Sequence, residues 1–439
     1  MARGALKNVK KALKGFFRHP EEASLEVLLR DYRSLEDEEK AQFFEELSRY
    51  GLSYEEWQEK VRSFLEPVAQ GDWRERLRHL RGELVTPRER FFKSFASVKG
   101  GLKFLLDLRA DLRRLGRRMK GFDWHEIDQD IVFLLDMWFV EGFLYLSEIG
   151  LDTPYRQISF LKEHDMVHPM TTVEDMARRL GKDRLCYALY HVLMPEEPIV
   201  FIEVALTEGI VSSIKEIMEP PPERQRPNTA IFYSINNTQQ GLAGLGLGKV
   251  LIGKVVEEIR RKYPNIKNFA TLSPIPGLWR RYFEPLLRGE GGFRMTREEL
   301  LRLFPEEARE AILSRYRLRG GKREDFAEAL HELFSSPDWI EEPVYVRHLA
   351  EPLRKAVYFY LTEEKDPRGR PLDPVANFHL ENGATVSPEH VRFLGNPYDY
   401  GVRNSLSFMV NYIYHLHWLE QIKETLPSLW GKIKGVFPS

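Results

Sequence analysis

The first third of the chain carries apolar side chains at helical spacing almost throughout. Two pairs with the spacing of a capping box, Ser34 with Asp37 and Ser53 with Glu56, predict the starts of two helices. Between Leu102 and Met119 the apolar positions share one face, and arginines occupy much of the rest. We interpret these arginines as a solvated face or a subunit contact. The pattern predicts a helical bundle that serves assembly.

The pattern changes in the second third of the chain. Short, bulky, apolar segments predict a pair of strands at Arg184–Leu193 and Pro198–Leu206, and a third strand at Thr229–Asn236. A glycine-rich loop and an amphipathic helix to about Tyr263 follow, and another apolar segment spans Asn268–Leu272. Strand, loop, helix and strand in this order predict a βαβ-type unit.

The sequence turns helical again from about Thr296 to Tyr360, and a last helix is expected over Asn404–Lys423. The expected fold class is therefore α+β. An N-terminal all-α helical domain, residues 1–151, contributes to oligomerisation. A catalytic domain with a mixed β-sheet and flanking helices occupies residues 152–439.

Composition narrows the function classes. The chain has 439 residues, and its 65 Lys and Arg against 66 Asp and Glu give a formal net charge of -1, so no global basic field attracts nucleic acid. The single cysteine, Cys186, excludes an intramolecular disulfide and a multi-cysteine metal site, which fits a reducing compartment such as the cytoplasm. The longest apolar stretch, residues 131–146, is interrupted by acidic side chains and is interpreted as a buried helix rather than a membrane span.

Residues 3–18 form a basic amphipathic pattern without an acidic side chain. Three interpretations are open: a peripheral contact with a membrane surface, an organellar presequence, or an N-terminal helix packed on its own domain. The last is favoured, because the segment is poor in serine and no hydrophobic signal core follows it.

The glycine-rich loop lies between a predicted strand and a helix start, where free N–H groups and the helix dipole favour an anion. A Walker A loop is excluded, because Ala243 holds the first glycine position and Val250 follows Lys249. A Rossmann fingerprint is weak, because Lys249 replaces its third glycine. Gly246 and Gly248 fit the GxG of the pyrophosphate loop in the GNAT acyltransferase superfamily. A glycine turn without a ligand is the remaining alternative.

Seven residues of this loop are the candidates for binding coenzyme A: Gln239, Gln240, Gly241, Gly244, Gly246, Gly248 and Lys249.

Most of residues 100–415 resembles the malonyl-CoA decarboxylase family. Five segments carry the resemblance: Cys186–Ile210, Phe232–Gly248, Thr271–Gly277 (TLSPIPG), Glu364–Ala384 (with FHLENGA) and Phe408–Tyr414 (FMVNYIY). The resemblance implies a helical N-terminal domain and a catalytic domain of GNAT type. It also implies a carboxy-lyase that converts malonyl-CoA to acetyl-CoA and carbon dioxide in fatty acid metabolism, as a homo-oligomer. No metal and no cofactor is expected, because coenzyme A is part of the substrate.

By the same resemblance, Ser273 and His379 are the catalytic pair. Ser273 is expected to hydrogen-bond the malonyl carboxylate or the thioester oxygen, and His379 to transfer a proton at the α-carbon. Tyr414 is a further candidate hydroxyl. Each has an ordinary alternative, since a serine before proline is commonly a turn residue, and a histidine or tyrosine between apolar residues is commonly part of the core.

The sequence departs from the family pattern at three positions, Asn377, Asn396 and Tyr398, two of them within the divergent tract 385–407. These departures leave open a substituted malonyl thioester as the substrate, an acyl-CoA-dependent acyltransferase, and a non-catalytic coenzyme A-binding regulator. A metal site at His164 and His168 is disfavoured, because HExxH requires Glu where Asp165 stands. The GxSxG motif of serine hydrolases is absent from the sequence.

Overall fold

The computed structural model describes residues 4–20, 25–65, 73–165, 172, 177–181, 183–219, 226–321 and 325–415. The chain forms two compact units. The first comprises Met1–Ser147, Leu189–Val200 and Asn237–Leu247, and the second comprises Glu148–Ala188, Phe201–Asn236 and Gly248–Ser439. The domain boundary expected after residue 151 stays a prediction.

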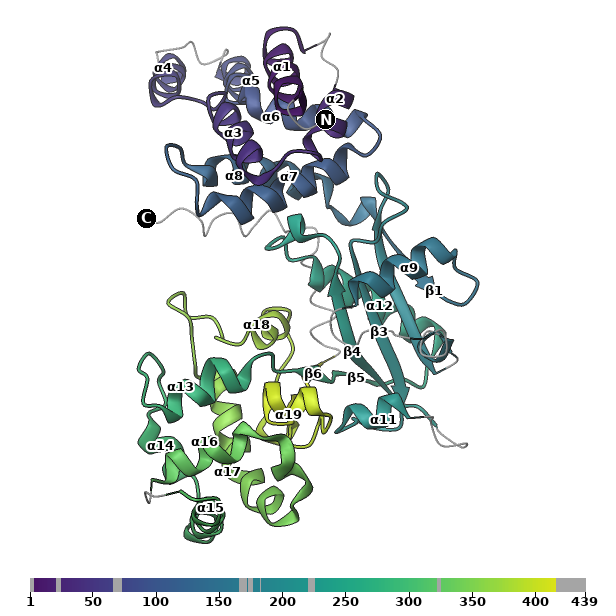
Figure 1. Ribbon diagram of the computed structural model, residues 1–439. Coiled ribbons are helices and arrows are strands. Elements are labelled where there is room, and N and C mark those ends of the chain that lie inside the picture. The colour runs from purple at the N-terminus through teal and green to yellow at the C-terminus, as the bar shows by residue number, and fades with distance from the viewer. Residues whose placement is uncertain are drawn as a thin grey trace. The chain divides into compact units, whose positions relative to one another are not determined.

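The N-terminal part of the first unit is helical, as predicted (Figure 1). Its helices are α1 (Ala5–Arg18), α2 (Leu25–Tyr32), α3 (Asp37–Ser48), α4 (Tyr54–Leu65), α5 (Trp73–Glu83), α6 (Pro87–Ser94), α7 (Gly101–Gly116) and α8 (Trp124–Trp138).

Helix α1 packs on its own domain. Val9, Leu13 and Phe16 are buried, and the Phe16 ring meets the Phe91 ring of α6 edge-on at 5.1 Å between centroids. The apolar face of α1 is therefore occupied inside the first unit. This confirms the packed-helix interpretation of the basic N-terminal segment, because a membrane-inserted helix needs that face free.

The two expected capping boxes differ in outcome. The pair Ser53 and Glu56 is confirmed, since each backbone N–H donates to the other side chain. The pair Ser34 and Asp37 is wrong, because the Ser34 hydroxyl donates back to the carbonyl of Asp31. Helix α3 begins at Asp37 with Glu36 as its N-cap instead.

Two further expectations in this region need correction. The apolar stretch 131–146 is not one helix, because α8 ends at Trp138 and strand β1 (Leu144–Ile149) follows. The arginines of α7 are not uniformly solvated, since Arg109 is buried and pairs with Asp128 of α8. The apolar face of α7 is buried as predicted.

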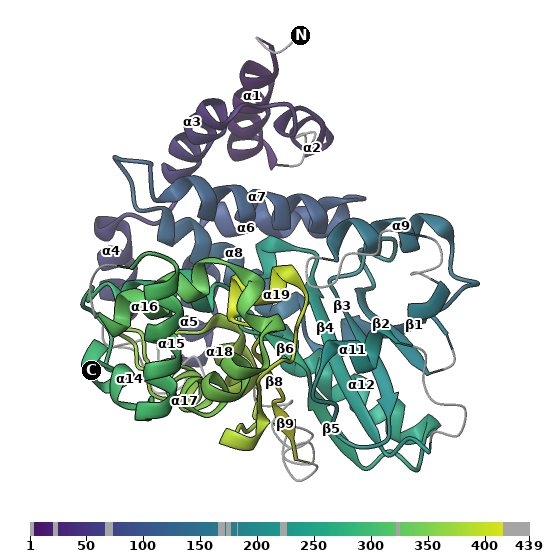
Figure 2. The same cartoon turned by 60° about the horizontal axis from the view of Figure 1, so that its bottom comes forward.

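The main sheet has six strands in the order β1-β2-β3-β4-β5-β9 (Figure 2). Beyond β1 its strands are β2 (Arg184–His191), β3 (Val200–Thr207), β4 (Thr229–Asn237), β5 (Asn268–Thr271) and β9 (Ile413–Tyr414). Strands β4 and β5 are parallel, and helix α12 (Leu247–Lys262) connects them, which confirms the βαβ-type unit. Strand β9 runs antiparallel to β5, so the sheet is mixed.

A smaller sheet has the order β6-β8-β7, formed by Ser273–Pro274, Met409–Val410 and Val391–Arg392. The remaining helices of the second unit include α9 (Tyr155–His164), α11 (Ile214–Met218), α13 (Glu284–Leu287), α14 (Arg297–Arg302), α15 (Glu306–Leu318), α16 (Phe326–Ser335), α17 (Pro343–Thr362), α18 (Pro374–Glu381) and α19 (Asp399–Ser405). A helical N-terminal region followed by a mixed sheet with flanking helices confirms the α+β class.

The expected last helix over residues 404–423 is wrong where the structure describes the chain. Helix α19 ends at Ser405, and β8 and β9 follow it. The apolar residues of FMVNYIY are therefore buried by pairing as short strands rather than by a helix face. Residues 416–423 of that expectation lie outside the described residues.

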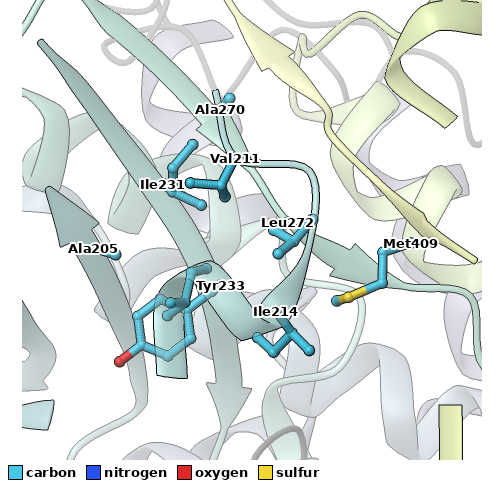
Figure 3. Packing of buried hydrophobic residues seen from close by; sticks show 9 residues of the cluster. Ala205, Val211, Ile214, Ile231, Tyr233, Ala270, Leu272 and Met409 are labelled. Atoms are coloured by element: carbon cyan, nitrogen blue, oxygen red, sulfur yellow. The ribbon is translucent and has the colours of Figure 1, made fainter. Parts of the chain in front are cut away.

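One apolar cluster of the second unit joins the main sheet to the smaller one (Figure 3). Ile231 and Tyr233 of β4 and Leu272, directly after β5, belong to it together with Met409 of β8. All four side chains are nearly inaccessible to solvent. Because interiors are close-packed, this cluster fixes the backbone that immediately precedes Ser273.

None of the helices in the described parts of the chain is both long and apolar enough to cross a membrane. Across the same described residues, no group of three or more His, Cys, Asp or Glu side chains could hold a metal ion. His164 contacts the carbonyl of Phe160 through Nδ1 at 2.8 Å, and His168 lies outside the described residues.

Candidate active site

Ser273 and His379 lie in direct contact although 106 positions separate them in the sequence. The Oγ atom of Ser273 is 3.1 Å from Nε2 of His379. Ser273 begins strand β6, and His379 is on helix α18, so the two side chains come from different elements of the second unit. Both are buried. The predicted pair is thus brought together at hydrogen-bond distance.

Tyr414 joins the pair from strand β9. Its hydroxyl is 2.8 Å from Nδ1 of His379, so both nitrogens of the imidazole are engaged. The expected helical setting of Tyr414 is wrong, because strand β9 and not a helix presents its side chain. The sequence therefore predicted the right residue on the wrong element.

The hydrogen bonds around this pair form a chain with one consistent direction. Ser273 Oγ donates to Thr271 Oγ1 at 3.0 Å, and Thr271 Oγ1 also accepts from the backbone N–H of Tyr412 at 3.0 Å. Because the Ser273 hydroxyl donates its hydrogen to Thr271, the Ser273 oxygen accepts from Nε2–H of His379. The other ring nitrogen, Nδ1, then accepts from the Tyr414 hydroxyl. This tautomer is assigned from the network, since hydrogen positions follow from the partners.

The orientation of the His379 ring is set by its neighbours. The ring of Tyr412 stacks on it at 4.7 Å between centroids and an interplanar angle of 24°. Helix α18 is held at its start by Asp373, whose Oδ1 accepts from the backbone N–H groups of Val375 and Ala376. Pro374 follows at the first helical position, which needs no N–H donor.

Sequence reasoning missed Thr271, Tyr412 and Asp373 as supports of the site. A usable signal existed for Asp373, because Asp followed by Pro before an apolar run is typical of a helix start. Thr271 and Tyr412 lie inside the two motifs TLSPIPG and FMVNYIY, but nothing in their spacing shows that Thr271 contacts Ser273 or that Tyr412 stacks on His379.

Burial keeps this chain of side chains neutral. Loss of solvation lowers the pKa of His379 to about 3, because the imidazolium form is not solvated there. Burial also raises the pKa of the Tyr414 hydroxyl well above its usual value. At neutral pH the site therefore holds a neutral imidazole between two neutral hydroxyl groups.

This shift predicts a pH-dependent stability. The pKa of His379 is about 3 in the folded protein and 6.5 for an unperturbed histidine, so the unfolded chain binds more protons between these values. The contribution of the uncharged His379 to the free energy of unfolding is fully present above about pH 6.5. It is lost as pH falls toward 3, at about 1.4 kcal/mol per pH unit. From pH 6.5 to 5 the parent should lose about 2 kcal/mol more than His379→Asn in urea unfolding. Equal losses would contradict a buried neutral imidazole.

The second half of the glycine-rich loop has the features of an anion site. Gly244 and Gly246 adopt φ angles of 90° and 66°, in the left-handed region where glycine is favoured, and both are exposed. Helix α12 then begins at Leu247, so its first N–H groups have no acceptor within the helix. Such a helix start favours phosphate.

Gly248 brings the first turn of α12 against α18. A Cβ atom at this position would lie 2.3 Å from the ring of Phe378, the residue before His379. Glycine is therefore required for this close approach. The contact places the start of α12 beside the helix that carries the histidine.

The other predicted loop residues divide by exposure. Gln239 and Gly241 are buried, and the Gln239 amide donates to Glu197 at 3.4 Å, so these two shape the loop from inside the first unit. Gln240 is exposed, and Lys249 is half-buried. The expected binding role of all seven residues stays a prediction.

The divergent positions lie apart from the described hydrogen bonds of His379. The side chain of Asn396 accepts from the backbone N–H of Tyr398 at 3.3 Å, and Tyr398 is exposed just before α19. Asn377 is half-buried on α18, two positions before the histidine. The replacements at 396 and 398 thus build a local turn.

Comparisons with known proteins agree with the motifs. A sequence profile described as the malonyl-CoA decarboxylase C-terminal domain matches residues 142–433, and one described as the N-terminal domain of the same family matches residues 50–139. Together these profiles cover most of the chain, including every segment that forms the site.

Two curated relatives illustrate the similarity. The mitochondrial malonyl-CoA decarboxylase of Anser anser anser is 35% identical over 340 residues, 76% of this chain and 65% of that protein. The mitochondrial malonyl-CoA decarboxylase of Mus musculus is 36% identical over 344 residues, 77% of this chain and 67% of that protein. The chain thus aligns with about two thirds of the length of these relatives.

Two solved structures resemble this fold over nearly the whole chain. The malonyl-CoA decarboxylase of Agrobacterium vitis has a TM-score of 0.76 at 28% identity and covers 96% of both chains. That of Rhodopseudomonas palustris has a TM-score of 0.73 at 28% identity, with 96% of this chain and 90% of that chain covered.

Proposed function

Since this chain belongs to the malonyl-CoA decarboxylase family, we propose that it decarboxylates malonyl-CoA to acetyl-CoA and carbon dioxide. The observation that carries the proposal is the buried hydrogen-bonded chain of Ser273, His379 and Tyr414, on residues that match the family motifs. Such a chain offers a donor and a proton carrier at one point, which is what this reaction requires.

The substrate is proposed to bind with its pyrophosphate at the glycine-rich loop and the first turn of α12. The contact between Gly248 and Phe378 supports this orientation, because it sets the start of α12 beside α18. The acyl end of a coenzyme A thioester then extends toward Ser273 and His379. Lys249, in the first turn, adds positive charge near the phosphates.

In the reaction, the bond between the α-carbon and the carboxylate carbon breaks and carbon dioxide leaves. Its electron pair moves into the thioester and forms an enolate, with negative charge on the thioester oxygen. The Ser273 hydroxyl is proposed to turn from Thr271 to this oxygen, since a donor placed where charge develops lowers the barrier. Thr271 Oγ1 keeps the N–H of Tyr412 as a partner during this rotation.

His379 is proposed to deliver the proton that completes acetyl-CoA. Its pKa of about 3 describes the site without substrate. A malonyl carboxylate nearby favours the imidazolium form and raises that pKa, so a proton is taken up with the substrate. As carbon dioxide leaves, the carboxylate charge is gone and the proton moves to the α-carbon. Tyr414 then holds the neutral ring through Nδ1.

No separate cofactor is proposed, because the thioester carbonyl of the substrate itself accepts the electron pair. The described residues supply the donor, the proton carrier and the phosphate site. Ser273, His379 and Tyr414 are thus the proposed reacting groups, with the loop residues 239–249 as the coenzyme A site.

The test is an assay of the full-length chain with malonyl-CoA and no acyl acceptor. We expect acetyl-CoA and carbon dioxide in equal amounts, measured by chromatography and by trapped gas. An acyltransferase would instead release free coenzyme A only after an amine or thiol is added. Turnover of methylmalonyl-CoA but not malonyl-CoA would replace the substrate, and coenzyme A binding without turnover would overturn the enzyme assignment.

The chain is further proposed to act as a homo-oligomer in fatty acid metabolism in the cytoplasm. Helix α4 supports the assembly, because none of its described side chains is buried and Tyr54, Trp57 and Leu65 are 66%, 44% and 72% exposed. Exposed large apolar side chains on one element are typical of a subunit interface. Sedimentation of a monomer at micromolar concentration would contradict it.

A further inference from the structure

Arg109 of α7 occupies an unusual position for an arginine, because only 2% of its surface is exposed. Its Nε donates to Oδ1 of Asp128 at 2.8 Å, and its Nη2 to Oδ2 at 3.4 Å. A buried guanidinium is costly unless its charge is balanced. Asp128 therefore balances the charge of Arg109 and fixes the plane of its guanidinium group.

The remaining terminal nitrogen of Arg109 contacts the glycine-rich loop. Nη1 donates to the carbonyl oxygen of Gly241 at 2.5 Å and to that of Ala243 at 3.2 Å. All these residues belong to the first unit. One side chain thus holds two carbonyl groups of the loop on α7.

A second contact presses the same part of the loop onto the same helix. A Cβ atom at Gly241 would lie 2.1 Å from the carbonyl oxygen of Leu106, so a side chain there requires the loop to move. Leu106 and Arg109 are three residues apart and therefore neighbours on one face of α7. The first half of the loop therefore packs against this face of α7.

The direction of the held carbonyls decides where the next N–H groups point. In a planar trans peptide the carbonyl and the following N–H point in opposite directions. With the Ala243 carbonyl turned to Arg109, the N–H of Gly244 is turned away from α7. Gly244 is exposed, with φ at 90°, and outward N–H groups in such a loop are the donors that a phosphate accepts.

We propose that Arg109 is a positioning residue for coenzyme A, acting from the helical region through the carbonyls of Gly241 and Ala243. It touches no reacting atom. The inference rests on the proposed function, since it takes the loop as the pyrophosphate site. A merely structural Arg109 would lower the stability of the first unit and leave substrate affinity unchanged, so the two roles are separable.

The test compares Arg109→Met with Arg113→Met. Arg113 is a matched control on the same helix, because its side chain is 41% exposed and lies 3.6 Å from the same Asp128. In Arg109→Met the KM for malonyl-CoA and the Kd for coenzyme A should rise about 10-fold or more, the expected effect of releasing a charge-assisted pair of hydrogen bonds. The kcat should change by less than about threefold, because the reacting groups are untouched. Arg109→Lys keeps the positive charge, so its KM and Kd should fall between those of the parent and those of Arg109→Met.

Either of two results with Arg109→Met overturns the proposal. A folded Arg109→Met variant with the same KM and Kd as Arg113→Met makes Arg109 structural. A loss of about 10-fold or more in kcat with an unchanged KM places the effect of Arg109 on the chemical step instead. If Arg109→Met does not fold, Asp128→Asn decides, since it removes the carboxylate charge and one of the two oxygens that accept from the Arg109 guanidinium; a rise in KM supports the proposal and no rise overturns it. Failure of the proposed function is distinct, because the parent chain itself would then produce no acetyl-CoA.

Discussion

Replacing His379 with asparagine should lower kcat for malonyl-CoA by about 10²–10⁴-fold, the usual contribution of a positioned acid or base. Asparagine retains a polar group between Ser273 and Tyr414 but cannot carry the proton to the α-carbon. The Kd for coenzyme A should stay nearly constant, because the phosphate site lies on other residues. Steady-state kinetics and calorimetric binding on the same preparation measure both quantities.

The matched control for this variant is His390→Asn. His390 also pairs with a serine, Ser387, through Nδ1 at 2.7 Å, but it lies outside the chain that links Tyr414 to Ser273. It should retain turnover within about threefold, because no described side-chain hydrogen bond links the half-buried His390 to Ser273, His379 or Tyr414. A folded His379→Asn enzyme with the turnover of the control would remove the histidine from the mechanism.

The core of the fold was predictable because its signals are local. Strand β4 and helix α12 carry uninterrupted apolar patterns, and their predicted bounds differ from the observed ones by little. The last helix was wrong for the opposite reason. The apolar residues 408–414 suit a helix or strands equally by composition, and only pairing with β5 and β6 makes them strands.

The contact between Ser273 and His379 could not be predicted from spacing. Their separation of 106 residues carries no geometric information, and the resemblance to a known family selected them. What the sequence could not supply at all was the pairing of Arg109 with the loop, 132 positions away from Gly241. An arginine among other arginines on an amphipathic helix is indistinguishable from a solvated one, since its burial depends on a tertiary contact.

The supports of the histidine show the same limit. Asp373 at the start of α18 is a local signal and could have been read as an N-cap. The stacking of Tyr412 on His379 is a contact between distant elements. Motif matching therefore found the reacting groups, whereas the residues that orient them became visible only in three dimensions.

Replacing Ser273 with alanine should lower kcat by about 10²–10³-fold, the usual effect of removing one donor to a developing oxyanion. The loss should fall on kcat more than on KM, because the negative charge on the thioester oxygen grows toward the transition state. The thermal stability of the variant should be measured together with its kinetics, since the buried Nε2 of His379 loses its 3.1 Å partner. Ser387→Ala is the matched control and should retain turnover.

The double variant of Ser273→Ala and His379→Asn discriminates between a shared and an independent role. If both groups act on the same enolate, removing either one already disables most of the step. The kcat of the double variant should then be close to that of the less active single variant. Independent roles would multiply, to about 10⁴–10⁷-fold in kcat, because separate contributions to the barrier add as free energies. Multiplying losses would therefore separate the two residues mechanistically, and parent-like turnover in both folded single variants would withdraw the decarboxylase mechanism from this site.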